Sequence, residues 1–201
     1  MTRCVTIISW NLLHRLGATV DQIEGLIVSN APDLLLMQEA TARIDALPSR
    51  IGGYYVRSAL PGRTHGLAAW SPIPLAHPPS LLTLPSGVIV RRICQIIDLA
   101  DFAVANVHLS HGQLLNRRQL RCVARALPAC AAIIGDCNML GASLLPGFRD
   151  AGPRQPTHAA GAIMPLRLDR CLVRGLRCVR AETLSRGTSD HRPILVQLSL
   201  A

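Results

Sequence analysis

A glutamate stands at the end of an apolar segment early in the chain. Glu39 follows the run Leu-Leu-Leu-Met-Gln at 34–38, which has the composition of a buried strand. An isolated buried carboxylate is costly and usually finds a metal ion or an ion pair. A surface glutamate that opens the following helix is the other interpretation, and Glu39 alone does not decide between the two.

A carboxylate and an amide follow a second apolar segment. Asp136 and Asn138 are two positions apart, so their side chains point the same way if the backbone stays extended. Gly135 lets the chain turn tightly or approach a ligand closely. The two side chains could hold a water molecule beside a phosphate oxygen. The tetrapeptide Gly-Asp-Cys-Asn is also typical of a turn, and taken alone it slightly favours the turn.

Two further pairs repeat this arrangement of polar residues. Asn106 and His108 have the same two-residue spacing, although a histidine that ends a strand is often only structural. Asp190 and His191 are adjacent, and they precede a closing strand. Adjacent acid and imidazole side chains can have different roles in one site: the acid binds a cation, and the imidazole contacts phosphate or transfers protons.

Asp169 lies in the segment Leu-Arg-Leu-Asp-Arg, a short way before His191. Its carboxylate could orient the imidazole of His191, as carboxylates orient histidines in other active sites. A salt bridge from Asp169 to Arg167 or Arg170 is the competing interpretation, with about even weight.

The elements that must position these residues form two segments of similar layout. In the first, an apolar strand at 5–10 leads to Asn11, a helix follows, and a buried strand then ends at Glu39. Thr19 and Gln22 have capping-box spacing at the start of that helix.

The second segment has the same order of elements. A strand at 102–107 leads to His108, a helix spans about 113–127, and a buried strand at 131–135 ends at Asp136. Delivering polar groups at the carboxyl ends of strands is how open α/β sheets build their sites.

The rest of the chain adds strands around these segments. A stretch rich in Pro and Gly at 49–86 separates them, with strand candidates at 66–70 and 87–97 that are consistent with antiparallel pairing. Further strands are expected at 167–173, 176–183 and 193–198. The pattern predicts a compact α/β sandwich.

Composition limits the class of protein. The length of 201 residues suits a single domain, 1–201, and 49% apolar content with 16% charged residues excludes a disordered chain. The apolar runs are shorter than the roughly 20 residues that span a bilayer, and the N-terminal one is too short and polar for a secretory signal.

Seven cysteines without a CxxC pair indicate free, mostly buried thiols. We expect a cytoplasmic monomer.

The net charge of +9 is typical of a protein that binds nucleic acid. All 21 basic residues are arginine, however, so part of the charge could reflect coding bias. Arg117, Arg121 and Arg125 could follow a phosphate backbone along one helix face, although such a face is more often simply solvated. Without lysine the chain has no Schiff-base chemistry.

Six short motifs taken together resemble the endonuclease/exonuclease/phosphatase superfamily, the DNase I-like proteins. They occur in the family's order: SWN at 9–11, QE at 38–39, NVHL at 106–109, GDCN at 135–138, RLDRCLV at 167–173 and SDHRP at 189–193. GLAAWSPIPL at 66–75 is similar to the family's internal strand pair, and PTH at 156–158 to its Thr-containing loop.

The resemblance implies a four-layer α/β sandwich, with two mixed β-sheets face to face and helices outside. It implies Mg²⁺ or Mn²⁺ as cofactor. The implied metal-binding residues are Asn11, Glu39 and Asp190; the implied catalytic residues are His108, Asp136, Asn138, Asp169 and His191; the implied phosphate contacts are Asn106, Asn138 and His191.

The resemblance also implies an activity. Asp136 would orient or deprotonate the attacking water, and His191, paired with Asp169, would stabilise the phosphoryl group. His108 stands where abasic-site endonucleases have Tyr, which indicates the His-bearing branch: pancreatic-type deoxyribonucleases, sphingomyelinases, inositol phosphatases and tyrosyl-DNA phosphodiesterases. We expect hydrolysis of a phosphodiester in nucleic acid. The alternatives are a small or lipid phosphate ester as substrate and, least favoured, an inactive binding protein.

Overall fold

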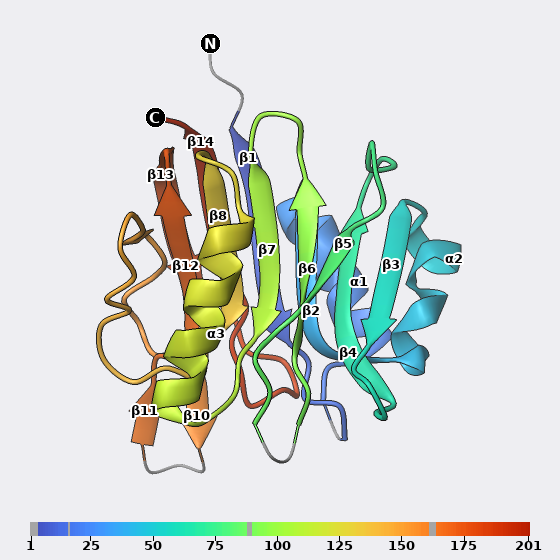
Figure 1. The fold of residues 1–201 in the computed structure, drawn as a ribbon. Coiled ribbons are helices and arrows are strands. Elements are labelled where there is room, and N and C mark those ends of the chain that lie inside the picture. Colours follow the sequence, from blue (N-terminus) through green and yellow to red (C-terminus); the bar gives the residue numbers. More distant parts are fainter. Residues whose placement is uncertain (1–3, 16, 88–89, 161–163) are drawn as a thin grey trace.

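Two six-stranded β-sheets face each other in the computed structural model, which describes residues 4–15, 17–87, 90–160 and 164–201 (Figure 1). The first sheet has the order β13 (Leu176–Thr183), β14 (Ile194–Leu200), β1 (Val5–Asn11), β2 (Leu34–Thr41), β4 (His65–Ser71), β3 (Tyr54–Ala59). The second has the order β5 (Ser80–Thr83), β6 (Ile93–Asp98), β7 (Ala103–His108), β8 (Ala131–Asp136), β12 (Asp169–Arg174), β9 (Arg149–Asp150). A separate hairpin joins β10 (His158–Ala160) to β11 (Met164–Leu166).

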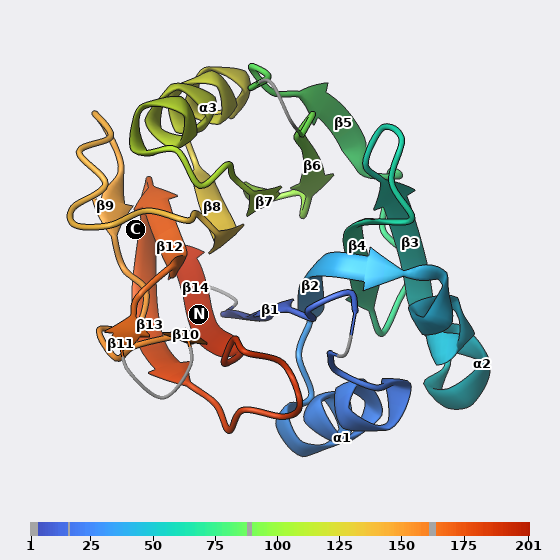
Figure 2. The same cartoon turned by 90° about the horizontal axis from the view of Figure 1, so that it is seen from below.

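Helices cover the outer faces of this pair of sheets. They are α1 (Val20–Asn30), the 3₁₀ helix η1 (Ala42–Ala46), α2 (Leu47–Ile51) and α3 (Gln113–Ala126). Seen along the strands, α1 and α2 lie outside the first sheet and α3 outside the second (Figure 2). The expected four-layer α/β sandwich is confirmed. Within the described ranges, no helix combines the length and the apolar character that crossing a membrane requires.

Each sheet contains one of the two similar segments predicted from the sequence. β1 and β2 pair in parallel across α1, and β7 and β8 pair in parallel across α3, whereas the other strand pairs are antiparallel. The predicted capping box is present at α1, where Thr19 and Gln22 exchange side-chain and backbone hydrogen bonds. On α3, Leu120 and Val123 are buried as expected.

Alternation along the strands divides the apolar residues into separate clusters. Between the sheets, Ile7 and Leu36 of the first sheet pack with Val104 and Ile134 of the second. On the outer faces, residues such as Ile8 and Leu35 pack beneath α1, while Ala105 and Ile133 pack beneath α3. The β-strands that carry polar groups at their ends are therefore packed on both faces.

Strand β2 does not end at Glu39, as the sequence had suggested, but continues to Thr41. Its register against β4 shifts between Met37 and Ala40, and Glu39 has a left-handed backbone with φ of 57°. This bulge is the physical reason for the difference. An extra residue bends the strand and re-aims a side chain while pairing resumes beyond it.

The two central strand candidates are both antiparallel to their neighbours, as expected, but they lie in different sheets. β4 pairs with β2 and β3 in the first sheet, whereas β6 pairs with β5 and β7 in the second. The strands β3 and β5, which have few fully buried residues, take the neighbouring positions. Within the candidate at 87–97, the structure has a strand only from residue 93 onward, which is β6. Residues 88 and 89 of the candidate lie outside the described ranges. In the 66–75 segment only β4 is a strand.

A buried network of amides links the two sheets. Asn106 on β7 donates through Nδ2 to the carbonyl oxygens of Met37 (3.3 Å) and Ala68 (3.1 Å) and to Oε1 of Gln95 (3.0 Å). Its Oδ1 accepts a 2.8 Å hydrogen bond from Gln38 Nε2. Because unpaired polar groups are costly in a core, this network restricts how one sheet can slide over the other.

Replacing Asn106 by Ala is expected to lower the free energy of unfolding by about 2–4 kcal/mol, because several buried partners lose their hydrogen bonds. Urea unfolding followed by circular dichroism measures the change. Asn30→Ala is the control, since Asn30 donates a single part-buried hydrogen bond to Leu26, and its loss should cost about 1 kcal/mol or less. Equal stability of the Asn106 variant and the unmodified protein would contradict this role.

Candidate active site at one end of the sandwich

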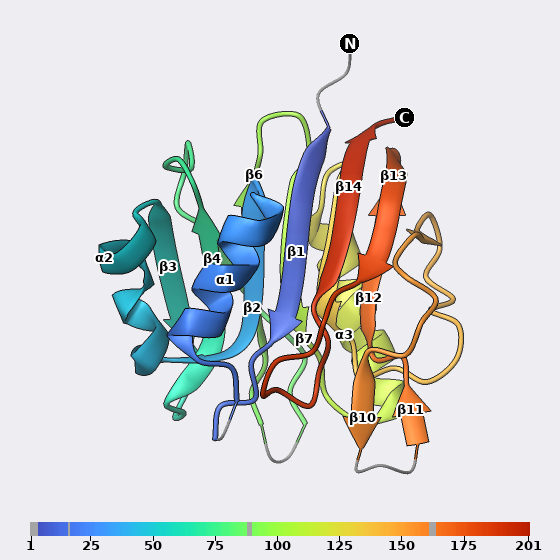
Figure 3. The same ribbon diagram turned by 180° about the vertical axis from the view of Figure 1, so that it is seen from behind.

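The strands β1 and β7 run in the same direction, so their carboxyl ends lie at one end of the sandwich (Figures 1 and 3). Asn11 pairs with Gln38 across β1 and β2, and His108 pairs with Asp136 across β7 and β8. The two sheets meet here through a 2.9 Å hydrogen bond from Asn11 Nδ2 to Asp136 Oδ2. Strand β1 begins and strand β14 ends at the opposite end (Figure 1).

Asp136 is held on several sides. Its Oδ1 accepts a 2.9 Å hydrogen bond from the backbone N of Asn138, and Nδ2 of Asn138 lies 3.3 Å from Oδ2. Nδ2 of Asn138 also donates to the carbonyl of Leu109 (2.9 Å), which fixes the amide. Asp136 is only 1% exposed, and burial raises its pKa against the opposing effect of His191.

The backbone before Asp136 needs glycine. Gly135 has φ of 142°, a conformation that side chains disfavour, and an added Cβ would lie 2.1 Å from the carbonyl oxygen of Val107 on the neighbouring strand. The close approach of β8 to β7 at this point therefore depends on glycine. This approach fixes the backbone position of the next residue, Asp136, and so the place of its carboxylate.

His191 and Asp169 form a buried pair. Nδ1 of His191 lies 2.8 Å from Oδ2 of Asp169, which leaves Nε2 directed toward Asp136 Oδ2 at 3.8 Å. Although burial opposes the charged form, the carboxylates of Asp169 and Asp136 raise the pKa of His191 to about 10. His191 is therefore an imidazolium at neutral pH. The salt bridge considered as an alternative for Asp169 goes instead to Asp150, which pairs with Arg167 and Arg170.

His108 lies between two carboxylates at the end of β7. Its Nε2 is 3.4 Å from Asp136 Oδ2 and 4.0 Å from Glu39 Oε1. Burial and the nearby Arg92 guanidinium hold the pKa of His108 well below its usual range. In contrast to His191, this imidazole is neutral at neutral pH.

Glu39 is turned into the site by the bulge in β2. Its Oε2 accepts a 3.0 Å hydrogen bond from the backbone N of His14 and contacts the ring Nδ1 of the same residue. The His14 ring stacks on His65, with centroids 4.0 Å apart. Although burial opposes it, the His14 hydrogen bonds lower the pKa of Glu39. A pocket of about 220 Å³ opens beside Glu39 and is bordered by Arg15 and Arg43.

Arg92 is a second buried cation near the site. It is 6% exposed, and its Nε has no hydrogen-bond partner among the residues that the structure describes. Burial lowers its pKa, while the charges of Asp136 and Glu39 act in the opposite direction, so the guanidinium lies within their field. A guanidinium with an unpartnered Nε–H at this place can donate a hydrogen bond to a phosphate oxygen.

Asp190 lies at the rim of the site, where its Oδ2 is 3.4 Å from Nε2 of His158. The His158 ring meets the His191 ring edge to face, with centroids 4.6 Å apart. Because His158 precedes β11 in an outlying hairpin while His191 precedes β14, two distant parts of the chain converge here.

The structure brings together seven of the eight central residues predicted from the sequence by direct contacts. These are Asn11, Glu39, His108, Asp136, Asn138, Asp169 and His191. Asp190 joins them through His158. Asn106, predicted as a phosphate contact, is fully buried, and its amide is occupied by Met37, Ala68, Gln95 and Gln38, so we do not place it in the site.

Four residues of the site were not predicted from the sequence: His14, His65, Arg92 and His158. His158 was visible as the last residue of the PTH motif, and His14 follows the SWN motif closely, so both had a signal. His65 and Arg92 belong to the Pro- and Gly-rich stretch and its continuation, where no periodic pattern marks them.

The side chains fit a hard divalent cation. Buried carboxylates gather in a small volume, and ligand atoms of Asp136, Asp169 and His191 lie within 4.8 Å of one another. Oδ1 of Asp169 and Oδ1 of Asp190 are both buried and lack a hydrogen-bond partner within the described part of the chain. Oxygen ligands of this kind suit Mg²⁺ or Mn²⁺.

Comparison with solved structures shows the same fold. An endonuclease/exonuclease/phosphatase from Bacteroides vulgatus superposes with a TM-score of 0.79 at 17% identity, covering 99% of this chain and 100% of the other. TDP2 from D. rerio complexed with a single-strand DNA product gives a TM-score of 0.79 at 14% identity, covering 98% and 99%. A Beutenbergia cavernae endonuclease/exonuclease/phosphatase gives 0.76 at 17% identity, covering 99% and 72%. None of the curated proteins matches the sequence.

The fold and the site together define a phosphoesterase with an α/β sandwich fold. Its carboxylates and imidazoles gather at the end of the sandwich where β1 and β7 have their carboxyl ends. The family model described as "Endonuclease/Exonuclease/phosphatase family" matches residues 8–191, which include every central residue of the site. The chain belongs to this family, whose members hydrolyse phosphoester bonds.

Replacing Gly135 by Ala is expected to destabilise the protein by about 3 kcal/mol or more, because the new methyl group meets backbone that cannot move aside. Thermal and urea unfolding measure the loss. Gly25→Ala is the matched control. Gly25 lies in α1 with no atom within 4 Å of an added Cβ, so the same change should raise stability by about 0.5–1 kcal/mol. A Gly135 variant as stable as the Gly25 variant would refute the constraint.

Proposed function

We propose that the protein hydrolyses a phosphodiester in nucleic acid with the help of Mg²⁺ or Mn²⁺. One observation carries the proposal: Asp136, held by Asn11 and Asn138, faces at 3.8 Å the imidazole of His191, whose pKa the neighbouring carboxylates raise to about 10. Asp136 can therefore act as the base for the attacking water, and His191 can bind a phosphoryl oxygen as a cation. The two groups are already adjacent in the protein without substrate.

In this proposal Asp136 accepts the proton of the attacking water. Burial raises its pKa, so the carboxylate is a stronger base than an exposed aspartate, while the hydrogen bonds from Asn11 and Asn138 fix its direction. Asn138 also holds the water next to the carboxylate through its Oδ1, because both N–H groups of its Nδ2 are directed at Leu109 and Asp136. Because its own amide is bound to Leu109, little reorganisation is needed on binding.

His191 binds the phosphoryl oxygens as an imidazolium. Asp169 holds its Nδ1, so the proton on Nε2 is the one offered to the substrate. The neutral His108 contacts another phosphate oxygen or assists the leaving group, and Arg92 neutralises charge beside it. These groups bind and orient the phosphate and move one proton at Asp136.

Glu39, with Asn11 and Asp190, would hold the divalent cation. Bound there, the cation would polarise the phosphate and neutralise its charge. Glu39 suits this role because His14 engages only its Oε2, while Oε1 faces His108 across 4.0 Å. In the structure Asn11 Nδ2 donates to Asp136 and its Oδ1 accepts a 3.2 Å hydrogen bond from the backbone N of Leu13, so a cation would use the second lone pair of Oδ1.

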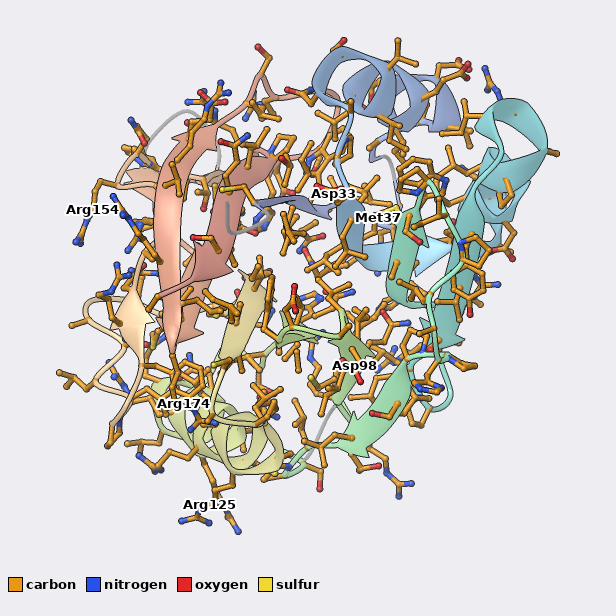
Figure 4. All side chains as sticks on the ribbon, turned by 90° about the horizontal axis from the view of Figure 1, so that it is seen from above. Asp33, Met37, Asp98, Arg125, Arg154 and Arg174 are labelled. Carbon is orange, nitrogen blue, oxygen red and sulfur yellow. The ribbon has the colours of Figure 1, made fainter. Side chains whose placement is uncertain are left out.

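Charge supports nucleic acid as the substrate. The protein has a net charge of +9, and Arg15 and Arg43 border the pocket beside Glu39. The similar TDP2 structure from D. rerio holds a single-strand DNA product, which adds support. Other arginines lie elsewhere: Arg125 on α3 and Arg154 both point outward from the molecule (Figure 4), as expected of solvated surfaces.

A small phosphate ester is the second candidate. Both tryptophans are buried, Trp10 at 2% and Trp70 at 4% exposure, so neither offers a surface on which bases could stack. This favours a substrate recognised through its phosphate alone. Release of phosphate or a headgroup from inositol phosphates or sphingomyelin, without cleavage of any oligonucleotide, would select this candidate.

Asp136→Asn is expected to lower the rate of oligonucleotide cleavage by about 10²–10⁴-fold, because an amide cannot take the proton from water. Cleavage of labelled single- and double-stranded DNA and RNA with Mg²⁺ or Mn²⁺ measures it, and a chelator should abolish the activity. Asp45→Asn, which changes an exposed carboxylate paired with Arg57, should leave the rate unchanged. Cleavage that survives both Asp136→Asn and chelation would rule out the mechanism.

Asp169→Asn tests the pair with His191 separately. The variant should reduce kcat by about 10²–10⁴-fold with little effect on KM, because the imidazole loses both its orientation and its charge. Asp150→Asn is the matched control: it removes a half-buried carboxylate that pairs with arginines instead of a histidine. That variant should lose stability and keep kcat per folded molecule. Similar kcat losses in both variants would show a purely structural effect.

A further inference from the structure

We infer that His158, Asp190 and His191 form a second cation site, selective for a borderline metal such as Zn²⁺, and that its occupation blocks the phosphoesterase reaction. Ligand atoms of the three residues lie within 4.8 Å of one another. The binding site stands on this geometry alone, whereas the inhibition rests on the proposed function.

The spacing of the ligand atoms suits a tetrahedral ion. Nε2 of His158 and Oδ2 of Asp190 are 3.4 Å apart. Two ligands at about 2.0–2.1 Å from a tetrahedral zinc are about 3.3 Å from each other. The two imidazole rings meet edge to face at 61°, so their nitrogens can approach one ion without the rings colliding.

His191 is already oriented as a metal ligand. Histidines that bind zinc usually donate their other ring N–H to a carboxylate, and here Nδ1 is held by Asp169 at 2.8 Å, so Nε2 is the ligand atom once a cation has displaced its proton. Asp169 is fixed in turn, because Thr157 Oγ1 accepts hydrogen bonds from the backbone N atoms of Leu168 (3.1 Å) and Asp169 (3.0 Å).

Backbone pairing holds the two halves of the site together. His158 and His191 form an isolated β-bridge, and the N–H of Arg192 donates to the carbonyl of Thr157 at 2.7 Å. Nδ1 of His158 and Oδ1 of Asp190 are buried without a hydrogen-bond partner among the described residues. The Asp190 side chain is 37% exposed, so an ion can enter from solvent on that side.

The donor set distinguishes this site from the one at Glu39, although Asp190 belongs to both and the two ions would compete for it. Two imidazoles and one carboxylate, with room for water as a fourth ligand, suit Zn²⁺, whereas Mg²⁺ prefers oxygen ligands. Because His191 cannot bind a metal and a phosphoryl oxygen through the same nitrogen, the two states exclude each other.

Zn²⁺ titration of the metal-free protein tests the site directly, with a chromophoric chelator as competitor. We expect one Zn²⁺ per chain, and His158→Gln should weaken its binding by about 10–100-fold or more. His77→Gln changes an exposed histidine on a distant loop and should bind as the unmodified protein does. The seven cysteines are the same in all variants, so thiol binding cancels in the comparison. Circular dichroism confirms that each variant is folded.

Equal affinity of the His158 and His77 variants would overturn the proposal. Zn²⁺ binding that Glu39→Gln abolishes and His158→Gln leaves intact would also overturn it, since the ion would then occupy the other site.

Inhibition is measured against each variant's own rate with Mg²⁺. Micromolar Zn²⁺ should inhibit the unmodified protein and the His77 variant, and the His158 variant should need a correspondingly higher concentration. Inhibition that is equal in all three would overturn the blocking role. A protein that binds Zn²⁺ as expected but hydrolyses no phosphoester would refute the proposed function and leave the cation site standing.

Discussion

The burial of the Asp136 carboxylate between the two sheets is the constraint on which the rest of the site depends. A charge with 1% exposure survives only with hydrogen bonds and a counter-charge around it. Asn11 from the first sheet and Asn138 from the second supply the hydrogen bonds, and His191 supplies the charge. Each partner comes from a different element, so the carboxylate is stable only when the whole sandwich is assembled. Folding and the formation of the site are one event.

That dependence explains the polar residues just beneath the site. Asn106, Gln38 and Gln95 join the sheets in a region that is otherwise apolar, where their hydrogen bonds are directional and hydrophobic contacts are not. Apolar packing alone would allow the sheets to shift by a fraction of an ångström. The amide network fixes the register between Asn11 and Asp136, and in this way a residue with no access to substrate helps to define the geometry of the chemistry.

Much of this arrangement could be predicted from the sequence, because it follows from local patterns. Both strand–helix–strand segments and the polar residue at each strand end were visible, and the order of the motifs indicated the fold. The bulge at Glu39 was not, since a register shift depends on the partner strand β4. The edge strands β3 and β5 lack a buried pattern, and Arg92 and His65 reach the site from segments without periodicity. Tertiary contacts, which no local pattern encodes, determine these features.

Strand β1 begins and β14 ends at the end of the sandwich far from the catalytic groups, side by side in an antiparallel pair, and this has a practical consequence. A molecule tethered to a bead or chip through either end would present its reactive edge to the solution. Two such anchors on adjacent strands would also pull the sheet apart in a zipper geometry, so a force experiment would report how strongly the first sheet holds together before the chemistry is lost.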